Sequence, residues 1–326
     1  MTDIVELSRV GAPSDPPAAF TKIDLKQIDV NLFLGEQATL WMPLAFNAKG
    51  VYGGQIVGQA LSAALKTVPP EKYVHSLHSY FLKKGNPKRD IVYNVKNLKD
   101  GASFSSRLVT ASQEGSSIFV MIASFQIPHP EAQRVIEHQA RMPQVPSPEE
   151  LPTMAQYYGM LLKDKRCPES WRPFLTKWST ETPPIDTRPV IVADFFAKFG
   201  PPPVSRPTYP QISELPREAM WIKCKSKLPD DPTVHAAVLA YASDMDLLGT
   251  AAKHQVPVVD MAIVASLDHA MWFHRKFRAD EWLLYSLESP RATDGRGLAY
   301  GSVFTQSGEL VVTVAQEGVL RLRSKG

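Results

Sequence analysis

VYNVKNLKDGASFSSRLVTASQEGSSIFVMIASFQ, residues 92–126, contains three runs rich in β-branched and aromatic residues, separated by two glycine-bearing turns. The turns are Asp100-Gly101 and Glu114-Gly115. Such pairs between alternating apolar and polar runs are the signal of tight connections between antiparallel strands. The stretch therefore predicts three consecutive antiparallel strands.

A second stretch about 190 residues further on repeats this order. LYSLESPRATDGRGLAYGSVFTQSGELVVTVAQEG, residues 284–318, again contains a strand, an Asp-Gly turn, a strand, a Gly-bearing turn and a strand. The segments ahead of the two stretches also resemble each other: SLHSYFLKKG at 76–85 and SLDHAMWFHRKF at 266–277. A shared order of this many segments indicates an internal duplication.

One segment with helical character lies upstream of each strand set. The first is YGGQIVGQALSAALKT at 52–67, and the second is TVHAAVLAYASDMDLLGTAA at 233–252, which we expect to begin at a capping Thr233 and to close near Gly249. Each follows a stretch that we interpret as a strand, around Trp41 and Trp221 respectively. We therefore predict an α+β fold in which each half is one long helix wrapped by a curled antiparallel sheet.

A proline-rich region without a repeat partner separates the halves. It contains PTMAQYYGMLLKDK at 152–165 and VADFFAKFG at 192–200, which are typical of short helices. We predict an N-terminal half at 20–128, a structured linker at 129–210 packed across the outside of both halves, and a C-terminal half at 211–323.

Composition argues against several classes of protein. The net charge of +3 is spread along the chain, which is too weak a signal for a nucleic-acid-binding protein. Cys167 and Cys224 show neither CxxC nor Cys/His spacing, so we expect no disulfide framework and no structural zinc. No run approaches the roughly 18 apolar residues of a membrane span. Small basic patches such as Lys83-Lys84 would suit a phosphate-bearing small molecule, although solvated loop charge is the simpler interpretation.

The two ends of the chain bear on its location. The first residues, MTDIVELSRVGAPSDPPAAF, have neither the character of a secretion signal nor that of a transit peptide. The last residues, Arg-Ser-Lys-Gly, differ by one from the peroxisomal address Ser-Lys-Leu. We expect the final Gly326 to weaken such a signal.

Two aspartates, Asp244 and Asp246, interrupt the apolar end of the second helix. On a helix at 100° per residue, Asp244 borders the apolar stripe, whereas Asp246 lies roughly 200° away and is interpreted as a solvated or helix-terminal acid. Aligning His235 with Tyr52 places Leu61 where Asp244 lies. The fold therefore does not require an acid there, which favours a functional Asp244 over a buried structural carboxylate.

The strands that follow supply further candidates. Alternation places Gln316 at the end of a buried apolar row, where its first-half counterpart is Ala123. A buried amide needs a partner, which a carboxylate or a water would provide, and exposure at the strand end is the alternative. Ser266 is a weaker candidate, and His269 and His274 of the same segment are more often structural residues.

No GxSxG, HExxH, P-loop or GxGxxG motif is present. Gly53 and Gly54 open the first helix. They would either turn backbone N–H groups toward a carbonyl or phosphate, or let the helix pack closely on the sheet.

Several motifs together resemble the type II acyl-CoA thioesterase family, the double-hotdog enzymes of bacteria and peroxisomes. They extend from about residue 35 to 321 and comprise VYGGQIVGQAL, SLHSYFL, DGASFSSRLVTA, YASDMDLL, DHAMWFHR, EWLLYSLES and VAQEGVLR. The resemblance implies a tandem double hotdog, a fatty acyl-CoA substrate and hydrolysis to a fatty acid and CoA without a cofactor. We also expect a homo-oligomer and a peroxisomal location, with the cytoplasm as the alternative.

The family's acting residues are an aspartate in the second helix, a serine or threonine in the next strand and a glutamine near the C-terminus. They correspond to Asp244, Ser266 and Gln316. Asp244 would then activate a water that attacks the thioester, while backbone N–H groups at a helix start stabilise the oxyanion. Direct attack by the carboxylate is the alternative.

Two other functions fit the same fold. A hydratase or dehydratase acting on acyl thioesters would need a catalytic histidine, for which His78 or His269 would serve. A protein that binds acyl-CoA without turnover would leave the buried acid of Asp244 unexplained.

Overall fold

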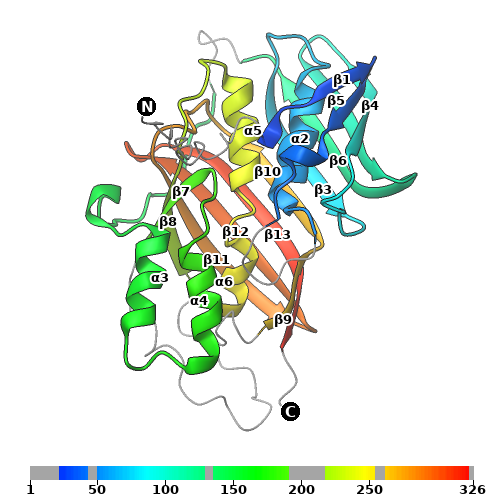
Figure 1. Ribbon diagram of the computed structural model, residues 1–326. Coiled ribbons are helices and arrows are strands. Elements are labelled where there is room, and N and C mark those ends of the chain that lie inside the picture. Colours follow the sequence, from blue (N-terminus) through cyan, green and yellow to red (C-terminus); the bar gives the residue numbers. More distant parts are fainter. Residues whose placement is uncertain (1–21, 43–49, 129–134, 191–216, 254–260, 323–326) are drawn as a thin grey trace, which may run out of the picture.

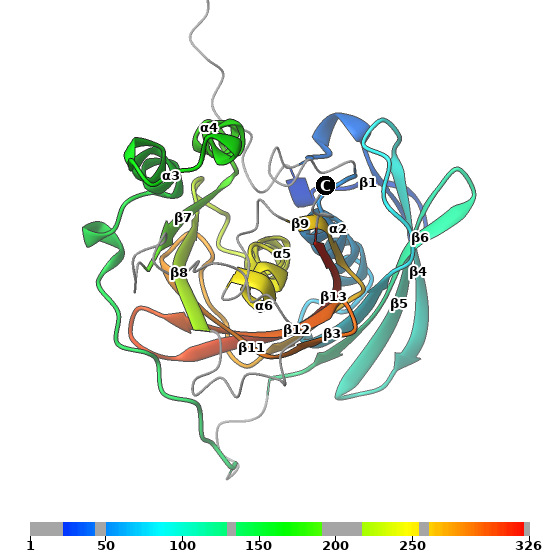
Figure 2. The same cartoon turned by 90° about the horizontal axis from the view of Figure 1, so that it is seen from below.

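The sheet runs through both halves of the chain (Figure 1) in the computed structural model, which describes residues 22–42, 50–128, 135–190, 217–253 and 261–322. Among these residues the strand order is β1-β2-β4-β5-β6-β3-β10-β13-β12-β11-β8-β7, and β9 pairs with β13. Every pairing is antiparallel. Figure 2 shows this sheet curving around the helices. The predicted double hotdog, an α+β fold, is confirmed.

The first half contains one long helix and the three strands predicted from its sequence. Glu114 and Gly115 both adopt positive φ, 48° and 75°, as a tight hairpin turn between β5 and β6 requires. The elements are β1 (Lys26–Asp29), β2 (Leu32–Gly35), α2 (Gly53–Leu65), β3 (Tyr73–Phe81), β4 (Ile91–Asp100), β5 (Phe104–Gln113) and β6 (Ser116–Gln126).

The second half repeats the order of helix followed by antiparallel strands, but its helical segment is split in two, two strands (β9 and β10) stand where the first half has β3, and one strand (β8) precedes the helix instead of two. Asp294 and Gly295, also at positive φ, form the predicted Asp-Gly turn between β11 and β12. The elements are β8 (Arg217–Cys224), α5 (Pro232–Ala242), α6 (Leu247–Lys253), β9 (Met261–Ser266), β10 (Asp268–Phe273), β11 (Leu283–Thr293), β12 (Arg296–Thr305) and β13 (Leu310–Leu322).

The halves meet at equivalent positions. β3 and β10 are neighbours at the centre of the sheet, and their register pairs Ser79 with His269. These residues hold the same place in the repeated motifs SLHS and SLDH. The Ser79 hydroxyl also donates a hydrogen bond of 2.7 Å to the carbonyl of His269. The duplication therefore produces two halves that face each other around this pair.

Two local predictions are wrong. The strand expected around Trp41 does not form: Gln37–Thr39 is a 3-10 helix, and Trp41 lies outside any strand, where its backbone binds the side chain of Gln55. The helix at 233–252 is not continuous, because α5 ends at Ala242 and α6 begins at Leu247. Its N-cap is Asp231 rather than Thr233.

Close contact between α2 and α5 depends on two glycines. A Cβ atom on Gly54 would lie 2.2 Å from the carbonyl oxygen of Tyr241, and one on Gly58 would lie 3.0 Å from that of Ala237. The sequence left open whether the Gly53-Gly54 pair served close helix-to-sheet packing. The close packing at Gly54 is instead against the backbone of another helix, so glycine is required by contact and not by its φ angle.

The described part of the middle region packs on the second half (Figure 1). It contains α3 (Met154–Lys163), α4 (Arg172–Ser179) and β7 (Ile185–Pro189), and β7 extends the sheet by pairing with β8. The Trp221 indole N–H donates to the carbonyl of Pro146 at 2.9 Å. The helix predicted at 152–165 is confirmed by α3, while the one predicted at 192–200 and the Ser-Lys-Gly terminus lie outside the described residues.

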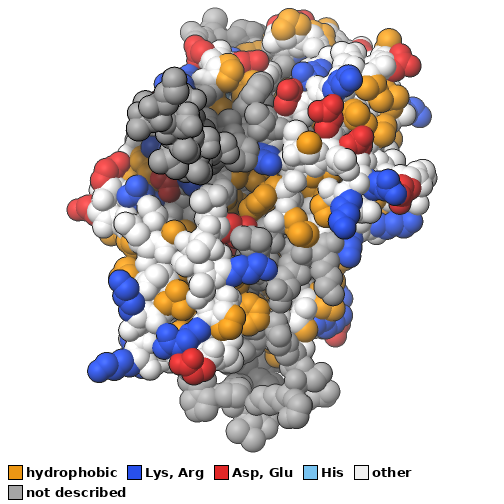
Figure 3. Space-filling model, viewed as in Figure 1, with side chains coloured by type: hydrophobic (Ala, Val, Ile, Leu, Met, Phe, Trp, Pro, Cys, Tyr) orange, Lys and Arg blue, Asp and Glu red, His pale blue; other side chains and the backbone are white. Residues whose placement is uncertain are grey.

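Many charged side chains lie at the surface, and the two cysteines lie inside the structure. Acidic and basic side chains are interspersed on the face shown in Figure 3. Cys167 and Cys224 are both buried, and they are not joined to each other by a disulfide bond. None of the helices in the described residues combines the length and apolar character of a membrane span.

Gly54→Ala should destabilise the fold by about 1–3 kcal/mol, because its methyl group has no space beside the Tyr241 carbonyl. Gly159→Ala in α3 is the matched control, since no atom lies within 4 Å of its added Cβ. This control should gain about 0.5–1 kcal/mol from helix propensity. Urea unfolding of both variants measures the difference, and equal stability of the two would contradict the packing argument.

Candidate functional site

Asp244 lies in the turn between α5 and α6, facing the start of α2. Its Oδ2 accepts a 2.8 Å hydrogen bond from the backbone N–H of Gly54. Its Oδ1 accepts a 2.8 Å bond from Nε2 of Gln316 and lies 3.5 Å from Oγ of Ser266. Both halves of the chain therefore hold this carboxylate. The three residues that the sequence singled out lie together around it.

Gln316 and Ser266 are brought together by strand pairing. Gln316 lies on β13 and is completely buried, which rules out the predicted alternative of exposure at a strand end. Ser266 is the last residue of β9, opposite Gly318 in the register with β13. The Gln316 Nε2 lies 2.5 Å from the Ser266 hydroxyl oxygen, so one amide group contacts both Ser266 and Asp244.

The register of the central strands corrects one detail of the repeat. β6 places Met121 opposite Ser79, as β13 brings Gln316 beside His269, the equivalent of Ser79. The first-half counterpart of Gln316 is therefore Met121 and not Ala123. Since both are buried apolar residues, no amide occupies this position in the first half.

Burial raises the pKa of Asp244 from 3.8 to about 6. The hydrogen bonds from Gln316, Gly54 and Ser266 oppose this shift, because they stabilise the ionised form. Loss of hydration is the larger effect. The carboxylate is thus ionised at neutral pH but is a stronger base than an exposed aspartate.

Asp246 occupies a different environment. It lies just before α6, with φ of 61°, and its carbonyl accepts a bond from the N–H of Thr250. The prediction of a helix-terminal acid holds, although the argument from a continuous helix was wrong. The interruption of the helix after Ala242, and not the helical phase, places Asp244 and Asp246 in different environments.

One of the backbone N–H groups predicted to bind the oxyanion at the start of α2, that of Gly54, is already engaged. The Gly54 N–H points at Asp244 and therefore orients the carboxylate. Sequence reasoning missed two buried hydroxyl groups nearby, those of Tyr52 and Tyr241, which have no hydrogen-bond partner among the described residues. Their rings lie 5.1 Å apart, edge to face. Burial, followed by the charge of Asp244, raises the pKa of Tyr52.

The three histidines considered from the sequence, His78, His269 and His274, lie in three different environments. His269 is completely buried and contacts Gln316, whereas His274 binds the Thr313 hydroxyl at the surface. His78 is exposed on the outer face of the sheet, against the edge of Trp272. Only His269 of these three contacts a residue around Asp244 in the described structure.

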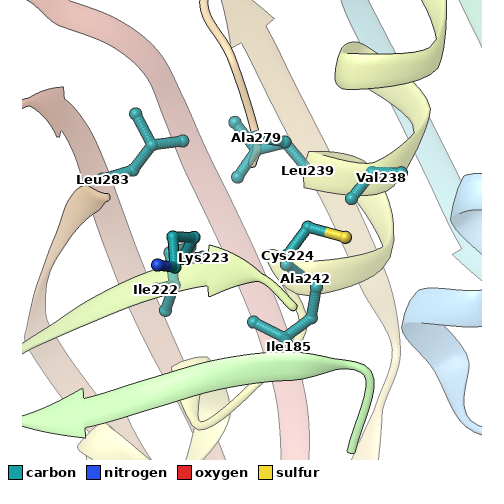
Figure 4. Close-up of a pocket in the computed structure, with 9 residues that line it drawn as sticks. All are labelled: Ile185, Ile222, Lys223, Cys224, Val238, Leu239, Ala242, Ala279 and Leu283. Atoms are coloured by element: carbon teal, nitrogen blue, oxygen red, sulfur yellow. The ribbon is translucent and has the colours of Figure 1, made fainter. Parts of the chain in front are cut away.

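A small cavity lies beside α5, between this helix and strands β7, β8 and β11 (Figure 4). Its lining is mainly apolar, and one of the lining residues, Ala242, precedes Asp244 by two positions. The lining consists of Ile185, Ile222, Lys223, Cys224, Val238, Leu239, Ala242, Ala279 and Leu283. Within the described ranges, no group of three or more His, Cys, Asp or Glu side chains could hold a metal ion.

One antiparallel sheet that curves around a helix from each half of a duplicated chain defines a double-hotdog protein, and here a buried carboxylate lies between the two helices. Two family models match the chain: an acyl-CoA thioesterase N-terminal domain at residues 42–126 and an acyl-CoA thioesterase model at 199–319. The chain therefore belongs to the acyl-CoA thioesterase family and is a thioester hydrolase.

Individual relatives agree with this assignment over nearly the whole chain. Acyl-coenzyme A thioesterase 8 of Homo sapiens is 38% identical, and the match covers 96% of this chain and 93% of the human protein. Peroxisomal acyl-coenzyme A thioester hydrolase 1 of Saccharomyces cerevisiae is 28% identical, with 86% and 88% covered. The crystal structure of acyl-CoA thioesterase II TesB2 from Mycobacterium marinum shares 37% identity, with a TM-score of 0.68 and coverage of 94% and 98%.

Asp244 should titrate near pH 6, whereas Asp164, whose pKa is lowered to about 2 by hydrogen bonds from Arg166, should not titrate above pH 4. Because the folded pKa of Asp244 exceeds the unfolded value of about 3.9, its stabilising contribution is complete below that value and is lost as the pH rises through 6. Carboxyl ¹³C NMR measures both groups. An Asp244 midpoint below 4 would contradict the desolvation argument.

Proposed function

We propose that the chain hydrolyses fatty acyl-CoA to a fatty acid and CoA, with Asp244 as the general base. The observation that carries this proposal is the contact of Asp244 with Gln316, Ser266 and the Gly54 N–H. Those donors fix the direction of a carboxylate whose pKa burial raises to about 6. General-base catalysis by such a group contributes about 10²–10⁴-fold.

The reaction begins with a water bound between Asp244 and Ser266. The Gln316 amide donates to the Ser266 oxygen, which leaves the Ser266 hydroxyl proton free for the carboxylate or the water. Asp244 takes a proton as the water oxygen attacks the thioester carbonyl. The C–S bond then breaks, and the CoA thiolate receives the proton from Asp244. Direct attack by Asp244 is less favoured, because donors engage both of its oxygens.

Buried hydroxyl groups are candidates for stabilising the oxyanion. The Gly54 N–H, which the sequence suggested for this task, is bonded to Asp244. The hydroxyls of Tyr52 and Tyr241 are buried donors without partners in the described residues, and a buried hydroxyl without a partner costs about 1–3 kcal/mol. A thioester oxygen would supply the missing acceptor.

The two competing functions receive less support. A hydratase needs a histidine free to exchange a proton, but both ring nitrogens of His269 are engaged by protein side chains, and His78 lies on the outer face of the sheet. A protein that only binds acyl-CoA has no need for a desolvated base. The structure offers no observation that favours either alternative.

Asp244→Asn should lower kcat by at least about 10²-fold, because an amide cannot accept a proton from water. Asp246→Asn is the matched control, since asparagine readily adopts its positive φ of 61°. Release of free thiol from acyl-CoA measures both variants, and the control should stay within about twofold of the wild type. Full activity of Asp244→Asn would refute the proposal.

We also propose that the chain forms a homo-oligomer through the outer face of its sheet. Strand register places exposed Ile122 and Tyr300 in one row across β6, β3, β10, β13 and β12, with Trp272 adjacent on β10. Light scattering of the purified chain should give a mass above 36.2 kDa that falls to this value in Ile122→Glu. A monomeric wild type would reject this proposal.

The location that we propose is the peroxisome, with the cytoplasm as the alternative. The support is the yeast relative, whose name describes it as peroxisomal.

A further inference from the structure

A line of buried side chains continues from Asp244 beyond the residues assigned above. Nε2 of Gln316 donates to Asp244, and Oε1 of the same amide lies 3.2 Å from Nδ1 of His269. On the other side of the imidazole ring, Nε2 lies 2.8 Å from the hydroxyl of Ser243. Gln316, His269 and Ser243 are all completely buried. The chain of contacts therefore runs from Asp244 back to its own sequence neighbour.

The chemistry of each atom fixes where the protons lie. Oε1 of Gln316 can only accept, so Nδ1 of His269 must carry the hydrogen. Burial lowers the pKa of His269 to about 4, so the ring is neutral and its Nε2 is an acceptor. The Ser243 hydroxyl is then the donor to this nitrogen, in competition with the carbonyl of Ala240 at 2.9 Å.

The other tautomer of His269 would disrupt the site. A bare Nδ1 would face Oε1 of Gln316, which places two acceptors against each other. The amide would relieve this conflict by turning over, and its oxygen would then face the carboxylate of Asp244. The bond to Asp244 would be lost, because neither oxygen can donate, and the Ser266 hydroxyl would have to donate its proton to the amide oxygen instead of to the carboxylate or the water. The direction of the Gln316 amide therefore depends on which ring nitrogen of His269 is protonated.

The surrounding fold holds the backbones of His269 and Ser243 in place. The Ser79 hydroxyl donates to the carbonyl of His269 where β3 and β10 pair at the centre of the sheet. The Tyr285 hydroxyl donates to the carbonyl of Ser243 at 2.6 Å. Neither contact involves Asp244, so the positions of the imidazole and the serine are set independently of the carboxylate.

We propose that His269, fixed in its Nδ1–H tautomer by Ser243, is a positioning residue for hydrolysis. It holds the Gln316 amide so that its N–H groups face Asp244 and Ser266. His269 does not contact the reacting atoms and exchanges no proton with the substrate. This inference rests on the proposed function, in which Asp244 is the base.

The test compares two replacements of His269 in the full chain. His269→Leu removes the donor and should lower kcat by roughly 10²-fold, the cost of a misplaced catalytic group, with KM changed by less than about threefold. His269→Asn places its amide N–H near the position of Nδ1 and should recover kcat to within about tenfold of the wild type. If His269 only filled the core, its replacement by the smaller asparagine would lose as much activity as its replacement by leucine.

Ser243→Ala provides a second measurement if His269→Leu does not fold. Its kcat should fall by about 3–10-fold, because the tautomer is no longer fixed, and ¹⁵N NMR of the His269 ring should show both tautomers instead of one. Wild-type kcat in His269→Leu, equal loss in His269→Asn and His269→Leu, or a single unchanged tautomer in Ser243→Ala would each overturn the inference.

Asp244→Asn in the same assay separates this inference from the proposed function. If Asp244→Asn is inactive while His269→Leu has full activity, the base assignment stands and the positioning role fails. If Asp244→Asn is fully active, the proposed function itself fails, whatever the histidine variants do.

Discussion

The hydrogen bond from the Gly54 N–H to Asp244 is the interaction on which the site depends. It joins the start of the first-half helix to the end of the second-half helix, across 190 positions of sequence. A helix start carries unsatisfied N–H groups and a partial positive charge, which favour a carboxylate. The same contact requires the two helices to approach closely, and Gly54 and Gly58 allow this because a side chain at either would meet the backbone of α5.

Loss of hydration and hydrogen bonding shift the pKa of Asp244 in opposite directions. Contact between the helices removes water, which raises its pKa to about 6, while the donors from Gln316, Gly54 and Ser266 prevent a larger rise. The outcome is a base that is ionised at neutral pH and has a fixed direction. A duplicated fold favours this arrangement, since its second half provides the acid and the amide while its first half provides the helix start. The first half holds apolar side chains at the equivalent positions, Leu61 and Met121.

Much of the fold was predictable because strand alternation and turn chemistry are local properties. The hairpins at Glu114-Gly115 and Asp294-Gly295 follow from their glycines, which adopt positive φ at no steric cost, and from Asp294, a residue type that tolerates it. The strand predicted around Trp41 was wrong, because an apolar run there resembles a strand. The backbone N–H of Trp41 instead donates to the side chain of Gln55. The break after Ala242 was also missed, because the sequence YASDMDLL contains neither glycine nor proline to mark the end of a helix, although α5 ends at Ala242 and α6 begins at Leu247.

The sequence by itself determined the duplication, the double hotdog, the family and the three candidate residues Asp244, Ser266 and Gln316. Periodicity and repeated motifs indicate the duplication and favour Asp244 and Gln316, because these features depend on residues near one another in the chain or on a second copy of the same pattern. The family and the role of Ser266 follow from the resemblance of several motifs to known thioesterases. Tertiary structure alone decided that the Gly54 N–H donates to Asp244 and that His269 contacts Gln316. It also decided that the buried hydroxyls of Tyr52 and Tyr241 have no hydrogen-bond partner within the described residues. Those contacts join distant segments, and their distances and proton positions are set by packing, which residue type and spacing do not specify.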